Sequence, residues 1–303
     1  MIKILIGGSP CTRWSVARTD GRETTASGIG WELFENFRYA RERFQPDLFL
    51  YENNASAAQE IKDQIGAELG VPLVHINSAL LSAQNRERFY ACNFEIEQPN
   101  DYGIMLRDVI LPAEEVPQKY WMDKPYTYHG DNKTVCATLN IRAMDIVKRV
   151  YNTNGKAPTL TCDGGGGHRQ KKIFQNGKCR KLTPVEYERL QTLPDNYTKA
   201  VSDSRRYSAI GNGWTAAIII HMLRGALKNV DRNEKLVVVS MYDGIATGRY
   251  CFDQLGFTNV EYYAFEIDPY AMAVANDNYP DIIQCGDAFQ MRDASFLLGG
   301  LLK

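Results

Sequence analysis

The chain has 303 residues, of which 44% are hydrophobic and 23% charged, enough to bury the core of one large domain and a smaller one. No apolar run approaches the ~20 residues of a membrane-spanning helix, and the N-terminus lacks the order of a secretory signal, so we expect an intracellular, cytoplasmic protein. Seven scattered cysteines without a C-x-x-C pair and four histidines without ligand spacing argue against disulfides and metal sites. The net charge of −1 argues against a protein whose whole surface binds polyanions. Basic residues nevertheless gather within 13–43 and again within 149–181.

A glycine turn directly after the first predicted strand presents a cysteine. The apolar residues 2–6 predict a short strand, and Gly7-Gly8-Ser9-Pro10-Cys11 follows at once. Glycine permits the unusual dihedrals of a tight turn and proline fixes its direction, so the Cys11 thiol can stand clear of the strand end as a nucleophile. The alternative is a buried cysteine that acts as a small apolar side chain.

Strand and helix patterns alternate after this turn. We predict helices over 31–44 and 56–69 and strands over 48–51 and 72–76, with an antiparallel strand over 85–92. Such alternation predicts a doubly wound, mostly parallel α/β sheet with functional groups at the carboxyl ends of its strands. Cys11 and Glu52 both fall at such ends.

The pattern changes between residues 95 and 177, which are rich in Pro, Gly and Thr. We interpret this stretch as a second, smaller lobe of irregular or β structure, most flexible at 164–167. Helical patterns return at 184–193, where Thr183 and Pro184 provide a start signal, and at 216–230.

A second candidate site follows the predicted strand 235–241. This strand leads into the glycine turn 242–248, which lacks the middle glycine that lets a backbone approach a pyrophosphate. Glu266 ends the next strand, where it could accept hydrogen bonds from ribose hydroxyls, and Asp287 follows the third, where it could receive an adenine amine. This arrangement suggests adenosine without phosphate, and hence S-adenosylmethionine. The alternative is two acids that merely cap helices.

Together these pieces resemble the DNA (cytosine-5)-methyltransferases over almost the whole chain. Gly8-Ser9-Pro10-Cys11 is similar to the family's catalytic loop, and Glu52-Asn53-Asn54 to its Glu-Asn-Val motif. The remaining similar segments are Gln84-Asn85-Arg86-Glu87-Arg88, then Arg180 to Pro184 continuing through Arg189-Leu190-Gln191 to Asp195, and Gly211-Asn212-Gly213.

The resemblance implies the fold of a class I, Rossmann-like methyltransferase and a set of site residues. The catalytic residues would be Cys11, Glu52, Arg86 and Arg88. The residues for S-adenosylmethionine would be Pro10, Asn212, Tyr242, Asp243, Gly244, Ile245, Ala246, Thr247, Glu266, Ile267, Asp287 and Ala288. The residues for double-stranded DNA would be Arg13, Arg18, Arg22, Arg149, Thr159, Thr161, Gly165, Gly166 and Arg169, with loop 12–30 closing over a flipped-out cytosine. No metal or membrane would be involved, a monomer is compatible with the scheme, and bacterial or phage origin is expected.

The order of the motifs departs from that of most relatives, in which the cofactor half precedes the Pro-Cys loop. Here the loop comes first, as after a circular permutation. We therefore predict a catalytic half over 1–94, a target-recognition lobe over 95–180, and the rest of the methyltransferase domain with the cofactor half over 181–303. The strand 2–6 must then lie parallel to and beside 235–241. Thr12, Asn54 and Trp214 replace residues that are common in relatives.

Three other functions compete with methylation of DNA at a short specific sequence. A tRNA cytosine-5 methyltransferase shares the chemistry, but the long segment 95–177 favours DNA. A catalytically silent DNA-binding relative is disfavoured because Cys11, Glu52, Arg86 and Arg88 are all present. A nicotinamide-dependent oxidoreductase is disfavoured by the missing phosphate-binding glycine.

Overall fold

The computed structural model describes residues 1–16, 18, 20–162 and 169–293, which divide into two compact units. Unit 1 comprises residues 1–76, 87–98 and 219–303, and unit 2 comprises residues 77–86 and 99–218. This division differs from the predicted segments because 77–86 and 181–218 fold with the lobe rather than with the parallel sheet. No helix of the described residues is long and apolar enough to cross a membrane.

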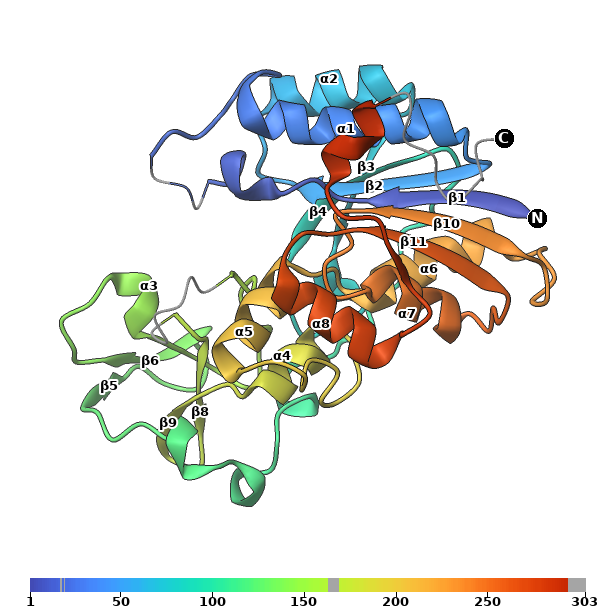
Figure 1. Cartoon of the computed structure of the whole chain (residues 1–303). Helices are drawn as coiled ribbons and strands as arrows, with labels where there is room; N and C mark the ends of the chain where they lie inside the picture. The colour runs from blue at the N-terminus through green and yellow to red at the C-terminus, as the bar shows by residue number, and fades with distance from the viewer. Residues whose placement is uncertain (17, 19, 163–168, 294–303) are drawn as a thin grey trace. The chain divides into compact units, whose positions relative to one another are not determined.

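Within the described residues, unit 1 is built on a seven-stranded sheet with the order β12-β11-β10-β1-β2-β4-β3 (Figure 1). Its strands are β1 Ile2–Gly7, β2 Leu48–Asn54, β3 Leu73–Asn77, β4 Glu87–Cys92, β10 Leu236–Met241, β11 Val260–Phe265 and β12 Ile283–Gln284. The strands from β12 through β2 pair in parallel, and β4 runs antiparallel to β2. The α/β fold and its mostly parallel sheet are as predicted.

The pairing of β1 with β10 confirms a specific expectation. The two strands are parallel and in register from Ile2 opposite Leu236 to Gly7 opposite Met241, although more than 200 residues separate them in the chain. β10 and the second half of β1 are buried on both faces, so their sequences are mostly apolar rather than alternating, with Lys3 and Ser240 as the exceptions. The glycine at the end of β1 is required, because a Cβ on Gly7 would lie 2.7 Å from the Met241 carbonyl oxygen.

Helices cover both faces of this sheet, with α1 and α2 on one side and α7 and α8 on the other (Figure 1). The helices are α1 Gly28–Phe44, α2 Gln59–Leu69, α6 Ala216–Ala226, α7 Thr247–Gln254, α8 Pro269–Asn278 and the 3-10 segments η1 Cys11–Arg13 and η6 Ala288–Arg292. Helix α1 buries Phe34, Phe37 and Phe44 along one stripe. It begins three residues before the predicted start, α2 begins three residues later than predicted, and α6 ends four residues earlier.

Among its described residues, unit 2 contains a separate five-stranded sheet with the order β5-β6-β7-β8-β9. Its elements are η2 Ser78–Leu80, η3 Leu106–Asp108, η4 Ala113–Glu115, η5 Gln118–Tyr120, β5 Tyr126–Tyr128, β6 Val135–Leu139, α3 Asp145–Lys148, β7 Arg149–Tyr151, β8 Lys172–Gln175, β9 Lys178–Lys181, α4 Pro184–Leu190 and α5 Asp203–Asn212. The predicted start of α4 is confirmed as a capping box, in which the Thr183 hydroxyl and the Glu186 carboxylate each accept from the other's backbone N–H. The lobe is thus more regular than its composition indicated.

Candidate active site

The turn that carries Cys11 is fixed by a buried hydrogen-bond cluster on its N-terminal side. The hydroxyls of Ser9 and Tyr51 lie 2.7 Å apart, and Asn53 Nδ2 donates to the Ser9 carbonyl and the Tyr51 hydroxyl at 2.9 Å each. The Tyr51 ring is fully buried against Phe34 and Phe37, and burial holds the pKa of its hydroxyl far above the usual range. The backbone at Ser9, two residues before Cys11, is therefore held in place by buried side-chain hydrogen bonds. Cys11 itself is partly exposed at the start of η1.

Glu52 and Arg88 form an ion pair at the ends of neighbouring strands. Arg88 Nε lies 2.7 Å from Glu52 Oε1, and both residues are more than nine-tenths buried. The antiparallel register of β2 and β4 places Arg88 opposite Asn54, two residues from Glu52 and therefore on the same face. The resemblance assigned both residues to the catalytic set, and the structure brings their two side chains together.

Arg86 lies in unit 2, where its guanidinium donates to backbone carbonyls. Nη1 donates to Leu160 at 3.1 Å, and Nη2 donates to Gly211 at 3.1 Å and to Gly213 at 2.9 Å. These contacts tie together the two segments of unit 2 that contain Thr161 and Asn212. Arg86 was predicted to be catalytic, but its observed contacts support a role in holding backbone.

Gln191 is the centre of a second buried network that the sequence did not identify. Its amide donates to the carbonyls of Ile210 and Gly213 and accepts from Gln84 and Thr215, with all four distances between 2.7 and 3.1 Å. The similarity of Arg189-Leu190-Gln191 to a family segment was the available signal, but side-chain contacts between distant residues cannot be inferred from spacing.

The glycine turn after β10 has an unusual backbone. Tyr242, Gly244 and Ala246 all adopt left-handed φ angles of 60°, 65° and 61°. The Glu266 carboxylate holds this turn, because it accepts hydrogen bonds at 2.8 Å from the N–H groups of Gly244, Ile267 and Asp268. Glu266 was predicted to bind ribose, and the structure gives it a second role as the acceptor that closes the turn.

The acid after the third strand also bonds to backbone. Asp287 Oδ1 accepts from the Phe289 N–H at 3.0 Å and so caps η6. This is the capping alternative that the sequence left open, and it leaves the second oxygen of Asp287 for other partners. Ala288, the next predicted residue, is buried.

Two buried oxygens at the glycine turn have no hydrogen-bond partner among the described residues, namely Asp243 Oδ2 and Thr247 Oγ1. The other Asp243 oxygen accepts from the Tyr262 hydroxyl at 2.6 Å, and burial raises the Asp243 pKa to about 6. The space where a Cβ of Gly244 would lie is open, and Ile267, which follows Glu266 in the chain, is 68% exposed. Unpaired polar atoms, an open glycine and an exposed apolar side chain fit a ligand with a polar end and a flat ring, as S-adenosylmethionine has.

The described residues of the loop after Cys11 are anchored at several points. Trp14 is fully buried, and a Cβ on Gly30 would lie 2.5 Å from its Nε1. Arg22 donates to the carbonyls of Trp14 and Ser56 at 3.1 and 2.6 Å, and Arg18 donates to that of Gly21 at 3.2 Å. The predicted phosphate-binding role of Arg22 therefore competes with existing bonds, whereas Arg13 keeps partial exposure.

The predicted readout residues lie in unit 2 with mixed surroundings. Arg149 pairs with Asp145 at 2.5 Å on the surface, and the Thr159 hydroxyl donates to the Asn85 carbonyl at 2.7 Å. The backbone of Thr161 packs within 2.6 Å of where a Cβ on Gly211 would be, so that position must be glycine. Arg169 is exposed, and Gly165 and Gly166 lie outside the described residues.

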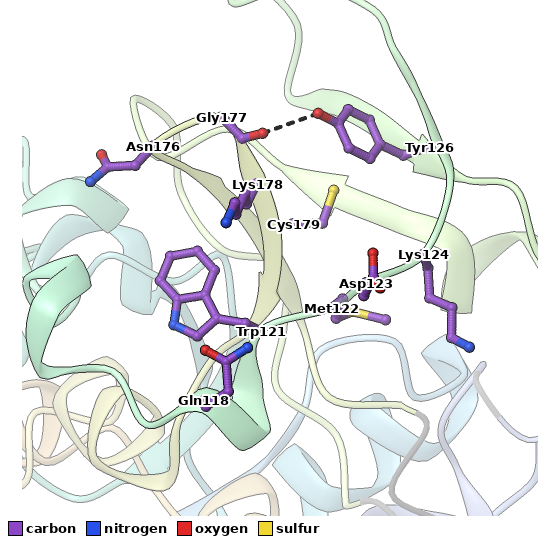
Figure 2. A pocket seen from close by; sticks show the side chains of 10 residues that line it. All are labelled: Gln118, Trp121, Met122, Asp123, Lys124, Tyr126, Asn176, Gly177, Lys178 and Cys179. Atoms are coloured by element: carbon purple, nitrogen blue, oxygen red, sulfur yellow. Dashed lines mark hydrogen bonds between the residues drawn. The ribbon is translucent and has the colours of Figure 1, made fainter.

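A separate surface cavity of about 550 Å³ lies in unit 2 beside the β8–β9 hairpin. Figure 2 shows the side chains that line it, with the Tyr126 hydroxyl bonded to the Gly177 carbonyl at the hairpin tip. Its lining residues are Gln118, Trp121, Met122, Asp123, Lys124, Tyr126, Asn176, Gly177, Lys178 and Cys179. None of them was predicted as a site residue.

Comparisons with known proteins agree with these local features. The family model described as C-5 cytosine-specific DNA methylase matches residues 1–156 and 119–227, which together make up three-quarters of the chain. The chain belongs to this family. It is 27% identical over 258 residues to the Type II methyltransferase M.HhaI of Haemophilus parahaemolyticus, covering 75% of each chain.

Two further relatives show the range of the similarity. M.HpaII of Haemophilus parainfluenzae, also a Type II methyltransferase, is 26% identical over 69% of this chain and 67% of its own length. The DNA (cytosine-5)-methyltransferase DRM2 of Oryza sativa subsp. japonica is 24% identical over 70% of this chain and 36% of its own length. The protein is accordingly a DNA (cytosine-5)-methyltransferase that uses S-adenosylmethionine, as its sequence predicted.

Proposed function

We propose that Cys11 is the nucleophile of this methyltransferase and that Glu52 and Arg88 hold the cytosine. In this scheme the Cys11 thiolate bonds through Sγ to carbon 6, which shifts the electron pair of the carbon 5–carbon 6 double bond toward carbon 5. Carbon 5 would then take the methyl group that S-adenosylmethionine supplies, while the bond from that methyl group to the sulfonium breaks with its electron pair to leave S-adenosylhomocysteine. Loss of the carbon 5 proton then restores the double bond as Sγ leaves. The observation that carries the proposal is the fixed Ser9-Tyr51-Asn53 cluster, which holds the turn in front of Cys11.

The Glu52–Arg88 pair supplies the complementary polar groups. A carboxyl group can hydrogen-bond ring nitrogen 3 and the amino group of cytosine, and this interaction strengthens as the ring gains a proton during addition. The guanidinium at 2.7 Å keeps the carboxylate oriented and balances its charge in a nearly buried position. Because the target base is out of reach inside a duplex, this arrangement requires a flipped-out cytosine.

S-adenosylmethionine supplies the methyl group, and we assign its site to the turn 242–247 with Glu266, Ile267, Asp287 and Ala288. The unpaired Asp243 and Thr247 oxygens are available for its polar end. We keep Pro10 and Asn212 as further contacts. The left-handed turn, closed by Glu266, fixes where these atoms point.

We also propose that the motif order reflects a circular permutation. The N-terminal ammonium pairs with Glu234, and the Ile2 N–H donates to the Lys235 carbonyl at 2.9 Å, which places the first residue at the amino end of β10. Arg43, at the end of α1, bonds the carbonyls of Arg292 and Asp293, and Lys3 lies over the ring of the adjacent Phe44. Residues 3 and 293 are thus both close to one helix end, which supports a short connection in a relative with the usual order.

A relinked variant tests the permutation. A flexible linker would join residue 303 to residue 1, with new ends opened between 231 and 234, where Asp231 and Asn233 are exposed. We expect this variant to fold with the same thermal stability within a few degrees and to methylate DNA. As a control, a second variant carries the linker inserted at 231–234 and keeps the original termini. If this control folds and the relinked variant does not, the proposal is contradicted.

We assign recognition of a short sequence in duplex DNA to the lobe predicted over 95–180, with Arg149, Thr159, Thr161, Gly165, Gly166 and Arg169 as candidate base or phosphate contacts. Arg13, Arg18 and Arg22 would contact phosphates without sequence preference. The catalytic segment 1–94 and the cofactor segment within 181–303 complete the division. The relatives named above as Type II methyltransferases support specific methylation.

Transfer of tritiated methyl groups to DNA, followed by bisulfite sequencing, tests the whole proposal and identifies the methylated context. Cys11→Ser should abolish transfer while S-adenosylmethionine binding, measured by calorimetry, stays the same, because Cys11 acts on the base. Duplex DNA with 5-fluorocytosine should trap a covalent complex with the unaltered protein. A trapped complex with the Cys11→Ser variant, or methylation of tRNA in place of DNA, would overturn the assignment.

A further inference from the structure

One buried polar side chain in α1 contacts the cofactor turn, and the mechanism above makes no use of it. Asn36 is completely buried in a helix face otherwise formed by Phe34, Phe37 and Ala40. Its Nδ2 donates to the Tyr242 hydroxyl at 2.8 Å, and that hydroxyl donates in turn to the Leu33 carbonyl at 2.8 Å. Tyr242 is the first residue of the left-handed turn after β10. The helix therefore holds the turn through a side chain rather than through apolar packing alone.

The other end of the same amide holds η6. Arg292 Nε donates to Asn36 Oδ1 at 2.6 Å, and Arg292 Nη2 donates to the Glu32 carbonyl at 2.6 Å. The guanidinium also lies over the ring of Phe289, 4.7 Å from its centroid. Phe289 is 39% exposed, and its N–H donates to the Asp287 carboxylate that caps η6. Through Asn36, α1 is thus bonded both to the turn at Tyr242 and to the segment that carries Asp287.

A buried amide in this place needs a reason, because apolar side chains would pack the same space without risk. An unpaired buried donor or acceptor costs roughly 1–3 kcal/mol, so a polar residue in an aromatic face is favourable only while both partners stay in place. The two partners sit at opposite ends of the proposed cofactor site. Tyr242 begins the turn at the polar end, and η6 follows Asp287 at the adenine end.

We propose that Asn36 is a positioning residue for S-adenosylmethionine, which fixes the spacing between the Tyr242 turn and the Asp287 segment. It sets cofactor affinity rather than the rate of the chemical step, because it touches neither Cys11 nor the Glu52–Arg88 pair. The inference rests on the cofactor site assigned under Proposed function. It adds Asn36, which lies outside the family motifs, to the residues that shape the cofactor site. Through Asn36, helix α1 contacts both the turn after β10 and the segment after β12.

A double-mutant cycle tests the proposal with calorimetric binding of S-adenosylmethionine to Asn36→Leu, Tyr242→Phe and the double variant. Asn36→Leu should raise the Kd about tenfold, which corresponds to ~1.4 kcal/mol. Tyr242→Phe should raise it by a smaller factor, because Arg292 keeps its bond to Asn36. The double variant should bind S-adenosylmethionine no more weakly than Asn36→Leu does. Its two apolar side chains leave neither an unpaired amide donor at position 36 nor an unpaired hydroxyl at position 242. At saturating cofactor, kcat should stay within about twofold of the unaltered value, while the KM for cofactor follows the Kd.

Glu42→Gln is the matched control, since Glu42 is exposed on the same helix and pairs with Arg38. Thermal unfolding of each variant separates folding from binding. Folded Asn36→Leu protein with unchanged Kd, or a fall in kcat without a rise in KM, would overturn the inference. Failure of the unaltered protein to bind S-adenosylmethionine would instead refute the proposed cofactor site, so the two failures are distinguishable.

Discussion

The nucleophile turn and the cofactor turn lie at the ends of adjacent parallel strands, yet they are stabilised in opposite ways. The first is held by side chains that bond one another, as in the Ser9-Tyr51-Asn53 cluster and the Glu52–Arg88 pair. The second is held by carboxylates that bond backbone N–H groups, and it keeps buried oxygens without partners. In the proposed scheme, the side chains of Ser9, Tyr51 and Asn53 that hold the thiol-bearing turn bond one another, whereas the turn proposed to bind S-adenosylmethionine has Asp243 Oδ2 and Thr247 Oγ1 without a partner among the described residues.

Replacement of Glu266 should have the largest effect on this contrast. Glu266→Ala removes the acceptor of the Gly244, Ile267 and Asp268 N–H groups, so the turn loses its closure and binding of S-adenosylmethionine should weaken by about 1–3 kcal/mol. Calorimetry measures this loss. Glu261→Gln, at the other end of β11, is the control and should bind normally. Equal binding by both variants would mean that the cofactor turn does not depend on its carboxylate.

A milder change tests the nucleophile turn. Tyr51→Phe deletes one hydroxyl from the buried cluster and should lower the free energy of unfolding by about 1 kcal/mol. Because the turn before Cys11 loosens, kcat should fall several-fold while the Kd for S-adenosylmethionine stays constant. Urea unfolding and single-turnover kinetics report the two effects, and Tyr39→Phe on α1 serves as the control. A change confined to the cofactor Kd would contradict the separation between the two turns.

The stability of the cofactor turn should also depend on pH, through the carboxyl group of Asp243. Burial raises the Asp243 pKa to about 6, above the ordinary carboxyl value near 4, so the folded protein binds this proton more tightly than the unfolded chain. The stabilisation that Asp243 gives the folded state is therefore fully present below pH 4 and is lost as the pH rises through 6. The side chain keeps its bond to Tyr262 and faces Glu266, whose charge adds to the rise.

Asp243→Asn, which cannot ionise, should therefore be more stable than the unaltered protein at pH 7.5, by on the order of 1–3 kcal/mol. The difference should shrink toward pH 4.5. Urea unfolding at the two pH values measures it. If Asp243→Asn were instead less stable than the unaltered protein by the same amount at both pH values, the carboxylate would be paired. That outcome would contradict the Asp243 Oδ2 that has no partner among the described residues.

Several features of the fold and site followed from the chain alone because they depend on local spacing. The apolar runs 2–6 and 235–241 identified the central strands, and the Thr183-to-Glu186 spacing identified a helix start. Gly7 to Cys11 predicted a turn that presents a thiol. The resemblance, rather than any local spacing, assigned Glu52 and Arg88 to one catalytic set, and the family itself was confirmed.

The tertiary structure alone decided which polar atoms meet. No spacing rule connects Asn36 with Tyr242 and Arg292, or Gln191 with Gln84 and Thr215, because hydrogen bonds between distant segments depend on how the elements pack. The same reason explains why Arg86 bonds backbone carbonyls in unit 2, and why 77–86 and 181–218 fold with the lobe. The sequence determined the central strands of the parallel sheet and the turns that follow them, and it predicted the reacting groups, since each of these patterns is encoded within a few residues. Side-chain partners required the packed chain, since each is set by the position of atoms that the sequence keeps far apart.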